Sequence, residues 1–214
     1  MGAAEVWLAD LDAIADELRE LLSADESARA ERFADPSHGA RWARSHGLLR
    51  HLLGGYLNGD PRRLRFTVAE HGKPALARQP RGLHFNISHS GHLALLAFAA
   101  DGEVGVDVEL ARGPTDVLGV ARRMFGAEEA RRLAGLRPPL REEEFLRAWV
   151  RSEAALKYDG RGLGGADSGP SGPAPWIAEL DVGADAAGAL ALACAPGGLR
   201  LWEWPGTRSA AGRA

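Results

Sequence analysis

The segment GVDVEL, residues 105–110, follows a long apolar run and places two acids two residues apart. Side chains of an extended chain point alternately to its two faces, so the valines share one face and Asp107 and Glu109 share the other. The valine face can enter a core, whereas two carboxylates this close repel each other and require water, a base or a cation. The segment therefore predicts a strand whose acidic face is either a solvated edge or one side of a cation site.

Composition excludes several classes of protein. The chain has 214 residues, of which 45% are hydrophobic, so it can bury a core in one large or two small domains. Its net charge of −3 argues against a nucleic-acid binder, which is normally basic. A single cysteine, Cys194, excludes a disulfide within the chain and suits a reducing cytoplasm. The acidic N-terminal segment is not typical of a signal peptide, and no apolar run reaches the length of a membrane span. We expect a cytoplasmic protein without a membrane segment.

Periodicity gives the elements of the first half. A short strand at 6–11 is followed by an amphipathic helix at 13–22, and Ser23 with Glu26 forms a capping box for the next helix. A strongly helical segment spans 39–58. The remaining elements are a strand at 64–70, a turn at 71–76, and two strands within 84–100 joined by the polar turn Ser-His-Ser-Gly.

The second half repeats the order strand, helices, strands. After the strand 105–110 come helical segments at 117–125 and 126–136, and a long helix at 141–160 ends at Gly160. A Gly/Pro/Ser-rich loop at 161–175 precedes three short strands at 176–180, 189–195 and 199–204. This pattern predicts an α+β fold of two similar halves, 1–102 and 103–205, each a small antiparallel sheet packed on helices, with a flexible tail at 206–214.

The long helix carries Phe145, Trp149, Glu153 and Lys157 at intervals of four residues, so these side chains lie along one face. A Glu–Lys pair at this spacing is by itself a common support of a helix surface. If the helix crosses the acidic face of the strand, however, Glu153 joins Asp107 and Glu109. Three carboxylates without histidine or thiolate suit a hard cation such as Mg²⁺, and Lys157 could then reach a phosphate.

Two loops add further groups that can contact phosphate. The turn Ser88-His89-Ser90-Gly91 offers hydroxyls and an imidazole, and Lys73 stands between Gly72 and Pro74. Each has a plainer interpretation: His89 could cap its turn, and Lys73 could be an exposed turn lysine. Taken together, the groups indicate a metal and cations arranged around a polyphosphate.

Segments in a fixed order carry a family resemblance: GKPAL (72–76) with FNISHSG (85–91), GVDVE (105–109) and WVRSEAALKYDGRGL (149–163). The set resembles the 4'-phosphopantetheinyl transferases of the larger, surfactin-synthetase-activating type. The segment 32–53 resembles that family's first helical region. The resemblance implies a pseudo-duplicated fold with coenzyme A in a cleft between the halves. It also implies a monomer that transfers phosphopantetheine, with Mg²⁺, from coenzyme A to a serine of an apo acyl or peptidyl carrier protein, as in secondary metabolite biosynthesis. The other product is adenosine 3',5'-bisphosphate.

The resemblance also implies roles for individual residues. Asp107, Glu109 and Glu153 would bind the metal, and Glu153 would draw the proton from the carrier serine, directly or through a water. Lys157 would neutralise the phosphate next to the leaving group. The nucleotide end and its extra phosphate would be held by Arg41, Lys73, Ser88 and His89.

Some positions depart from the family pattern. Ser152 stands where the family has lysine, Val150 replaces a small polar residue, and His46 stands where arginine is frequent. These changes remove positive charge or a hydrogen bond near the ligand, so they bear on rate and coenzyme A affinity. Two alternative functions stay open on the residues: a Mg²⁺-dependent phosphohydrolase of coenzyme A or nucleotides, and a non-catalytic module that binds coenzyme A or a carrier.

Overall fold

The structure, a computed structural model, describes residues 2–68, 73–78, 82–100, 102–111, 116–160 and 173–205. The predicted loop at 161–175 and the tail at 206–214 fall largely or wholly outside these ranges, as do residues 71–72 of the predicted turn. No helix in the described ranges is both long and apolar enough to cross a membrane.

The first half contains nine elements in the described chain. They are strand β1 (Ala3–Asp10), a 3₁₀-helix (Asp16–Leu21), α1 (Ala24–Glu31), α2 (Pro36–Tyr56), a 3₁₀-helix (Pro61–Arg63), β2 (Phe66–Val68), β3 (Pro74–Leu76), β4 (His84–Ser90) and β5 (Leu93–Ala99). The second half contains β6 (Val104–Leu110), α3 (Val117–Ala134), α4 (Pro138–Tyr158), β7 (Trp176–Leu180), β8 (Ala186–Leu192) and β9 (Gly198–Glu203).

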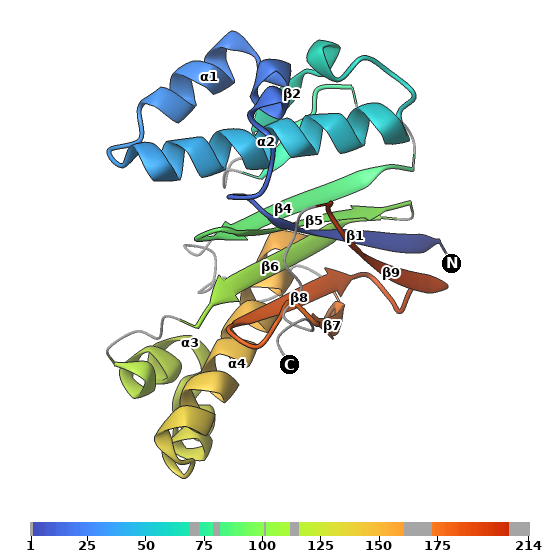
Figure 1. The fold of residues 1–214 in the computed structure, drawn as a ribbon. Helices are drawn as coiled ribbons and strands as arrows, with labels where there is room; N and C mark the ends of the chain where they lie inside the picture. The colour runs from blue at the N-terminus through green and yellow to red at the C-terminus, as the bar shows by residue number, and fades with distance from the viewer. Residues whose placement is uncertain are drawn as a thin grey trace.

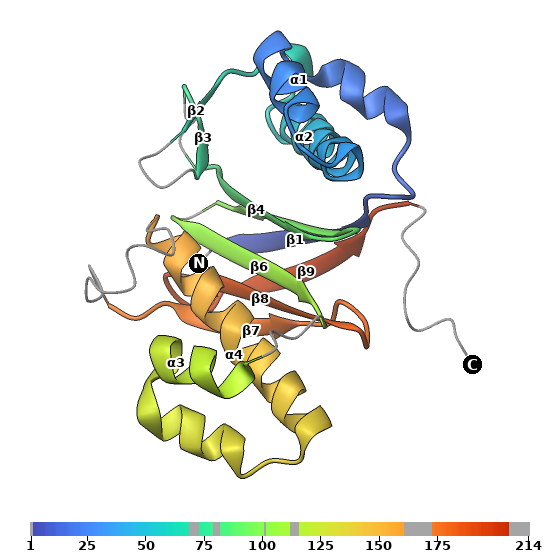
Figure 2. The same cartoon turned by 90° about the vertical axis from the view of Figure 1, so that its left-hand side faces the viewer.

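These elements form four layers, which both views show (Figures 1 and 2). Helix α2 covers one face of the sheet β4-β5-β1-β9, and helix α4 covers the outer face of the sheet β6-β8-β7. Between the sheets lies the main core, built from alternate residues of β1, β5, β6 and β8 such as Val6, Leu95, Val106 and Leu190, each fully buried. The predicted α+β fold of two sheet-and-helix halves is confirmed.

Strand β9 crosses between the halves. The sequence places it in the second half, whereas in the structure it pairs parallel with β1 of the first sheet, with Val6 opposite Leu201. Its residues are all exposed. The chain therefore ends the second half by returning to the edge of the first sheet.

Three of the predicted local structures are wrong. Residues 74–76, predicted as part of a turn, form strand β3. The segment 13–22 forms a 3₁₀-helix, Asp16–Leu21, in place of an amphipathic α-helix. It lies so close to α2 that a Cβ on Gly47 would come 2.3 Å from the carbonyl oxygen of Leu18. The residues Ser88 to Ser90 belong to β4, and the turn consists of Gly91 and His92 alone, with Gly91 at φ +54°.

Other local predictions are confirmed. Ser23 and Glu26 make a capping box at the start of α1. Helix α4 ends at Tyr158, with Gly160 at φ +69° just beyond it. The two helical segments predicted around residue 126 are the arms of α3, which bends at Gly126, where φ is +88°.

Strand β6 and helix α4 approach each other at Gly105. A Cβ at this position would lie 2.0 Å from the carbonyl oxygen of Ala154 and 2.3 Å from the backbone nitrogen of Tyr158. Only a glycine lets the backbones of β6 and α4 come this close. The contact places the last turns of α4 directly over the acidic face of β6.

We predict that Gly105→Ala lowers the free energy of unfolding by about 3 kcal/mol, because backbone atoms on both sides cannot yield to the added methyl group. Gly55→Ala is the matched control, since a Cβ there meets nothing within 4 Å and alanine favours the α2 helix by about 1 kcal/mol. Urea unfolding of the two variants measures both effects. Equal stability of the two variants would contradict the close approach.

Candidate active site

The two sheets meet along one side, where β4 and β6 lie next to each other. Side chains of β4 make the bonds that a backbone ladder would otherwise make. The Oδ1 atom of Asn86 accepts from the backbone N–H of Val106 at 2.8 Å. Ser88 Oγ donates to Asp107 Oδ1 at 2.8 Å, and Ser90 Oγ donates to Glu109 Oε2 at 2.6 Å. We call this row of contacts between β4 and β6 the seam.

Helix α4 brings a cation to the seam. Lys157 Nζ donates to Asp107 Oδ1 at 2.6 Å and to Ser88 Oγ at 2.8 Å. Asp107 is only 2% exposed, so its charge has little access to water and depends on these partners. Lys157, which the sequence analysis assigns to a phosphate, therefore contacts Asp107 and Ser88 in the structure.

Glu153 lies one turn before Lys157 and is 9% exposed. Its Oε1 atom and the Oδ2 atom of Asp107 are buried and have no hydrogen-bond partner among the described residues. Burial raises the pKa of Glu153, and the charge of Asp107 raises it further. Burial likewise raises the pKa of Glu109, again with a contribution from Asp107. Three carboxylates thus repel one another in a poorly solvated place, which is the condition that a divalent cation relieves.

The donor set fits a hard cation in its chemistry, but the side chains are not gathered around one point. Within the described part of the chain, no three or more His, Cys, Asp or Glu side chains stand in an arrangement that could hold a metal ion. Lys157 and Ser88 share one oxygen of Asp107, and Ser90 takes one oxygen of Glu109, so one oxygen of each acid is engaged. Glu153, whose buried Oε1 has no hydrogen-bond partner among the described residues, would have to turn toward the two acids of β6 to share a cation with them.

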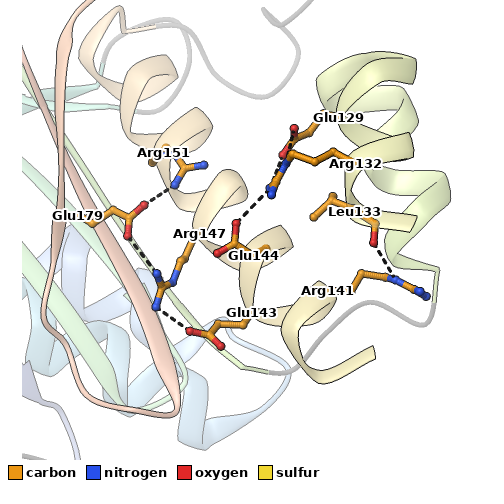
Figure 3. A network of polar contacts seen from close by, with 9 residues as sticks. All are labelled: Glu129, Arg132, Leu133, Arg141, Glu143, Glu144, Arg147, Arg151 and Glu179. Carbon is orange, nitrogen blue, oxygen red and sulfur yellow. Dashed lines mark hydrogen bonds and ion pairs between the residues drawn. The ribbon is translucent and has the colours of Figure 1, made fainter. Parts of the chain in front are cut away.

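Ion pairs join α4 to β7 and to α3 (Figure 3). Arg147 and Arg151 both pair with Glu179 of β7. Arg132 of α3 pairs with Glu144 of α4 at 3.1 Å. These contacts tie α4 to its sheet and to α3, which helps to hold Glu153 and Lys157 over β6.

The other predicted ligands lie apart from the carboxylates. Lys73 Nζ pairs with Glu103 Oε2 at 2.7 Å and donates to the carbonyl oxygen of Val104 at 3.1 Å, at the start of β6. Arg41 makes a bidentate pair with Asp12, with distances of 2.9 and 2.6 Å. Both cations already have acidic partners.

His89 is exposed and lies on the face of β4 opposite to Ser88 and Ser90. Partial desolvation of its ring lowers its pKa, and the charges of Lys157 and His38 lower it further.

Comparison with known proteins identifies this arrangement. Residues 103–194 match a family model described as the 4'-phosphopantetheinyl transferase superfamily, and residues 7–101 match one described as the N-terminal region of a 4'-phosphopantetheinyl transferase. The chain is 38% identical over 163 residues to the 4'-phosphopantetheinyl transferase HetI of Nostoc sp., which covers 74% of this chain and 69% of HetI. The chain belongs to the 4'-phosphopantetheinyl transferase superfamily.

Two Bacillus subtilis transferases are also similar to it. The 4'-phosphopantetheinyl transferase ffp is 31% identical over 148 residues, which are 69% of this chain and 64% of ffp. The 4'-phosphopantetheinyl transferase Sfp of strain 168 is 28% identical over 142 residues, which are 66% of this chain and 62% of Sfp. The resemblance to the larger, surfactin-synthetase-activating type is thereby confirmed.

A basic cavity of about 350 Å³ in the first half of this transferase was not predicted. Its lining includes the four arginines Arg29, Arg32, Arg50 and Arg65, the acids Asp25 and Glu26, and the rings of Trp42 and His46. The guanidinium of Arg29 lies 5.0 Å over the ring of Trp42, and His46 stacks on the same indole at 3.7 Å. Burial lowers the pKa of His46 to about 3, so His46 adds no positive charge to the cavity. The resemblance of segment 32–53 to the family's first helical region could have indicated a ligand site near Trp42 and His46. It could not have indicated Arg29, which precedes that segment.

A further cavity of about 300 Å³ lies between the halves. It is lined by Ala3, Ala99, Glu103, Leu192 and Cys194 among others, and the three carboxylates are not part of its lining. Glu103, the partner of Lys73, therefore lines this cavity, whereas Asp107, Glu109 and Glu153 do not.

We predict that Mg²⁺ stabilises the protein more as pH rises. Because the pKa values of Glu109 and Glu153 are raised in the folded state, the folded protein holds these protons more tightly than the unfolded chain does. The metal-free protein therefore loses stability as the pH rises above 4.5, the ordinary pKa of a glutamate side chain. A divalent cation relieves the repulsion that remains once the carboxylates are ionised. The increase in melting temperature on adding Mg²⁺ should be larger at about pH 7.5 than at about pH 5. An increase that is the same at both values, or larger in acid, would contradict this electrostatic account.

Proposed function

We propose that Asp107, Glu109 and Glu153 hold Mg²⁺ while this transferase moves the 4'-phosphopantetheine group of coenzyme A to a serine of an apo acyl or peptidyl carrier protein. Adenosine 3',5'-bisphosphate is the other product. The observation that carries the proposed site is a pair of buried carboxylate oxygens, on Asp107 and Glu153, that have no hydrogen-bond partner among the described residues and lie beside the ammonium of Lys157. When bound, the cation would withdraw charge from the pyrophosphate of coenzyme A, which otherwise repels a nucleophile.

Lys157 binds and orients the phosphate next to the leaving group. Its ammonium carries three protons, and two of them are donated to Ser88 and Asp107. The third proton is available to a phosphate oxygen. Because Asp107 and Ser88 fix the ammonium, little reorganisation is needed when charge develops on the leaving phosphate.

Glu153 takes the proton of the carrier serine, directly or through a water. A serine hydroxyl is a weak nucleophile and needs a base within hydrogen-bond reach. Burial raises the pKa of Glu153, which makes its carboxylate a stronger base than one on the surface.

Arg41, Lys73, Ser88 and His89 hold the nucleotide end and its extra phosphate. Arg41 and Lys73 each pair with a carboxylate, so binding exchanges Asp12 and Glu103 for phosphate oxygens that carry more charge. The basic cavity beside Trp42 supports a nucleotide on this side of the molecule, because Arg29 and Arg32 add charge that His46 does not supply.

The enzyme works as a cytoplasmic monomer in this proposal, since β4 of one half and β6 and α4 of the other supply the proposed site within a single chain. The family relationship favours this transfer over a phosphohydrolase or a non-catalytic binding module.

We predict that incubation with coenzyme A, Mg²⁺ and an apo carrier increases the carrier mass by one phosphopantetheine, as read by mass spectrometry. Asp107→Asn and Glu153→Gln should each lower the rate by about 100-fold or more, because each removes a proposed metal ligand and Glu153→Gln also removes the base. Glu143→Gln is the control: Glu143 is an exposed acid on the same helix that pairs with Arg147. The proposal fails if the carrier mass stays unchanged with the wild-type protein, or if all three variants match it.

We predict that Arg41→Ala weakens discrimination between coenzyme A and 3'-dephospho-coenzyme A by about tenfold, through a higher KM for coenzyme A alone. The physical reason is loss of the guanidinium that is proposed to bind the extra phosphate. Arg132→Ala serves as a matched control, because Arg132 makes a similar bidentate pair with Glu129 on α3. An Arg41→Ala enzyme that loses affinity equally for both substrates would place the extra phosphate elsewhere.

A further inference from the structure

Alternate residues of β4 meet alternate residues of β6 along the seam, and the contacts repeat with a step of two. Ser88 donates to one oxygen of Asp107, and Ser90 donates to one oxygen of Glu109. Both pairs have the same separation of nineteen residues along the chain. The third carboxylate, Glu153, comes from α4 and has no hydroxyl on its buried Oε1.

We propose that Ser90 is a positioning residue for Glu109: its hydroxyl fixes Oε2 and leaves Oε1 as the oxygen that binds the cation. The inference rests on the metal site proposed above. Ser88 acts in the same way on Asp107, whose Oδ1 is engaged and whose Oδ2 is buried without a partner among the described residues.

The direction of the Ser90 hydroxyl is fixed by a second contact. The backbone N–H of Leu110 donates to Ser90 Oγ at 3.2 Å. With one lone pair of the oxygen engaged by this N–H, the hydroxyl proton is directed at Glu109 Oε2, 2.6 Å away. A hydrogen bond this short to a carboxylate is charge-assisted and holds the rotamer of the acid.

The three carboxylates therefore differ in freedom. Asp107 and Glu109 are each held by a serine of β4, whereas Glu153 is held by none. Asp107 and Glu109 are thus held in one orientation, whereas Glu153 can reorient. This difference suits a site in which Glu153 also accepts a proton. Partners that orient metal ligands in this way contribute strongly to metal affinity, commonly by 10- to 100-fold.

The test measures Mn²⁺ affinity in the absence of coenzyme A, by electron paramagnetic resonance of the free ion, together with the Mg²⁺ concentration that half-saturates carrier modification. The variants are Ser90→Ala, and the pair Ser90→Thr and Ser90→Val, which differ from each other only by a hydroxyl in place of a methyl group. We expect Ser90→Ala and Ser90→Val to weaken Mn²⁺ binding by about tenfold or more and to raise the Mg²⁺ requirement by the same factor. Ser90→Thr should stay close to the wild type, and turnover at saturating Mg²⁺ should change little in all three.

Asn86→Ala is the control for a merely structural role. Asn86 is 3% exposed and occupies the same face of β4, but its side chain contacts the backbone of Val106 and no carboxylate. It should lower the melting temperature, because the N–H of Val106 loses its acceptor, while Mn²⁺ affinity is kept. If Ser90→Ala does not fold, the Thr and Val variants decide, since a β-branched residue suits a strand.

The inference is overturned if Ser90→Val binds Mn²⁺ as tightly as Ser90→Thr, or if Asn86→Ala weakens Mn²⁺ binding as much as Ser90→Ala does. In both cases the proposed function stands as long as the wild type modifies a carrier in a metal-dependent manner. If the wild type neither binds Mn²⁺ nor requires a divalent cation, the proposed metal site fails and the inference fails with it.

Discussion

The seam between β4 and β6 joins the two halves through side chains. Asn86 and Ser90 accept from the backbone of β6, at Val106 and Leu110, where a neighbouring strand would otherwise pair. This contact satisfies an edge that would otherwise be open, and it leaves the carboxylates of β6 directed at the hydroxyls of β4. The same bonds that hold the molecule together therefore set the geometry of the proposed metal ligands. Gly105 completes the arrangement, because it lets α4 bring Lys157 down to Asp107.

Much of this arrangement was predictable from the sequence because it depends on short periods. The period of two in GVDVEL put Asp107 and Glu109 on one face, and the period of four in the long helix put Glu153 and Lys157 on one stripe. That Lys157 meets Asp107 was not predicted, since no local rule says which strand a helix will cross. The capping box at Ser23 was readable for the same local reason.

The rest depended on contacts between distant segments. The segment around Leu18 has an apolar helical pattern, yet it forms a 3₁₀-helix that packs closely against Gly47 of α2. Strand β9 returns to β1 although every one of its residues is exposed, so its pattern gives no sign of a partner. The pairing of Arg41 with Asp12 joins residues 29 positions apart. The contacts of Ser88 and Ser90 with the β6 acids could not be predicted either. The sequence places both serines in a turn, whereas in the structure both belong to strand β4.

The most direct measurement of the central claim is a crystal structure with coenzyme A and Mn²⁺, in which anomalous scattering locates the metal. The account predicts one strong peak within coordination distance of an oxygen from each of Asp107, Glu109 and Glu153, in contact with the pyrophosphate. Ser90 should remain bonded to the other oxygen of Glu109, and Lys157 should contact a phosphate. A peak elsewhere, or a Glu153 side chain turned away from the two acids of β6, would contradict it.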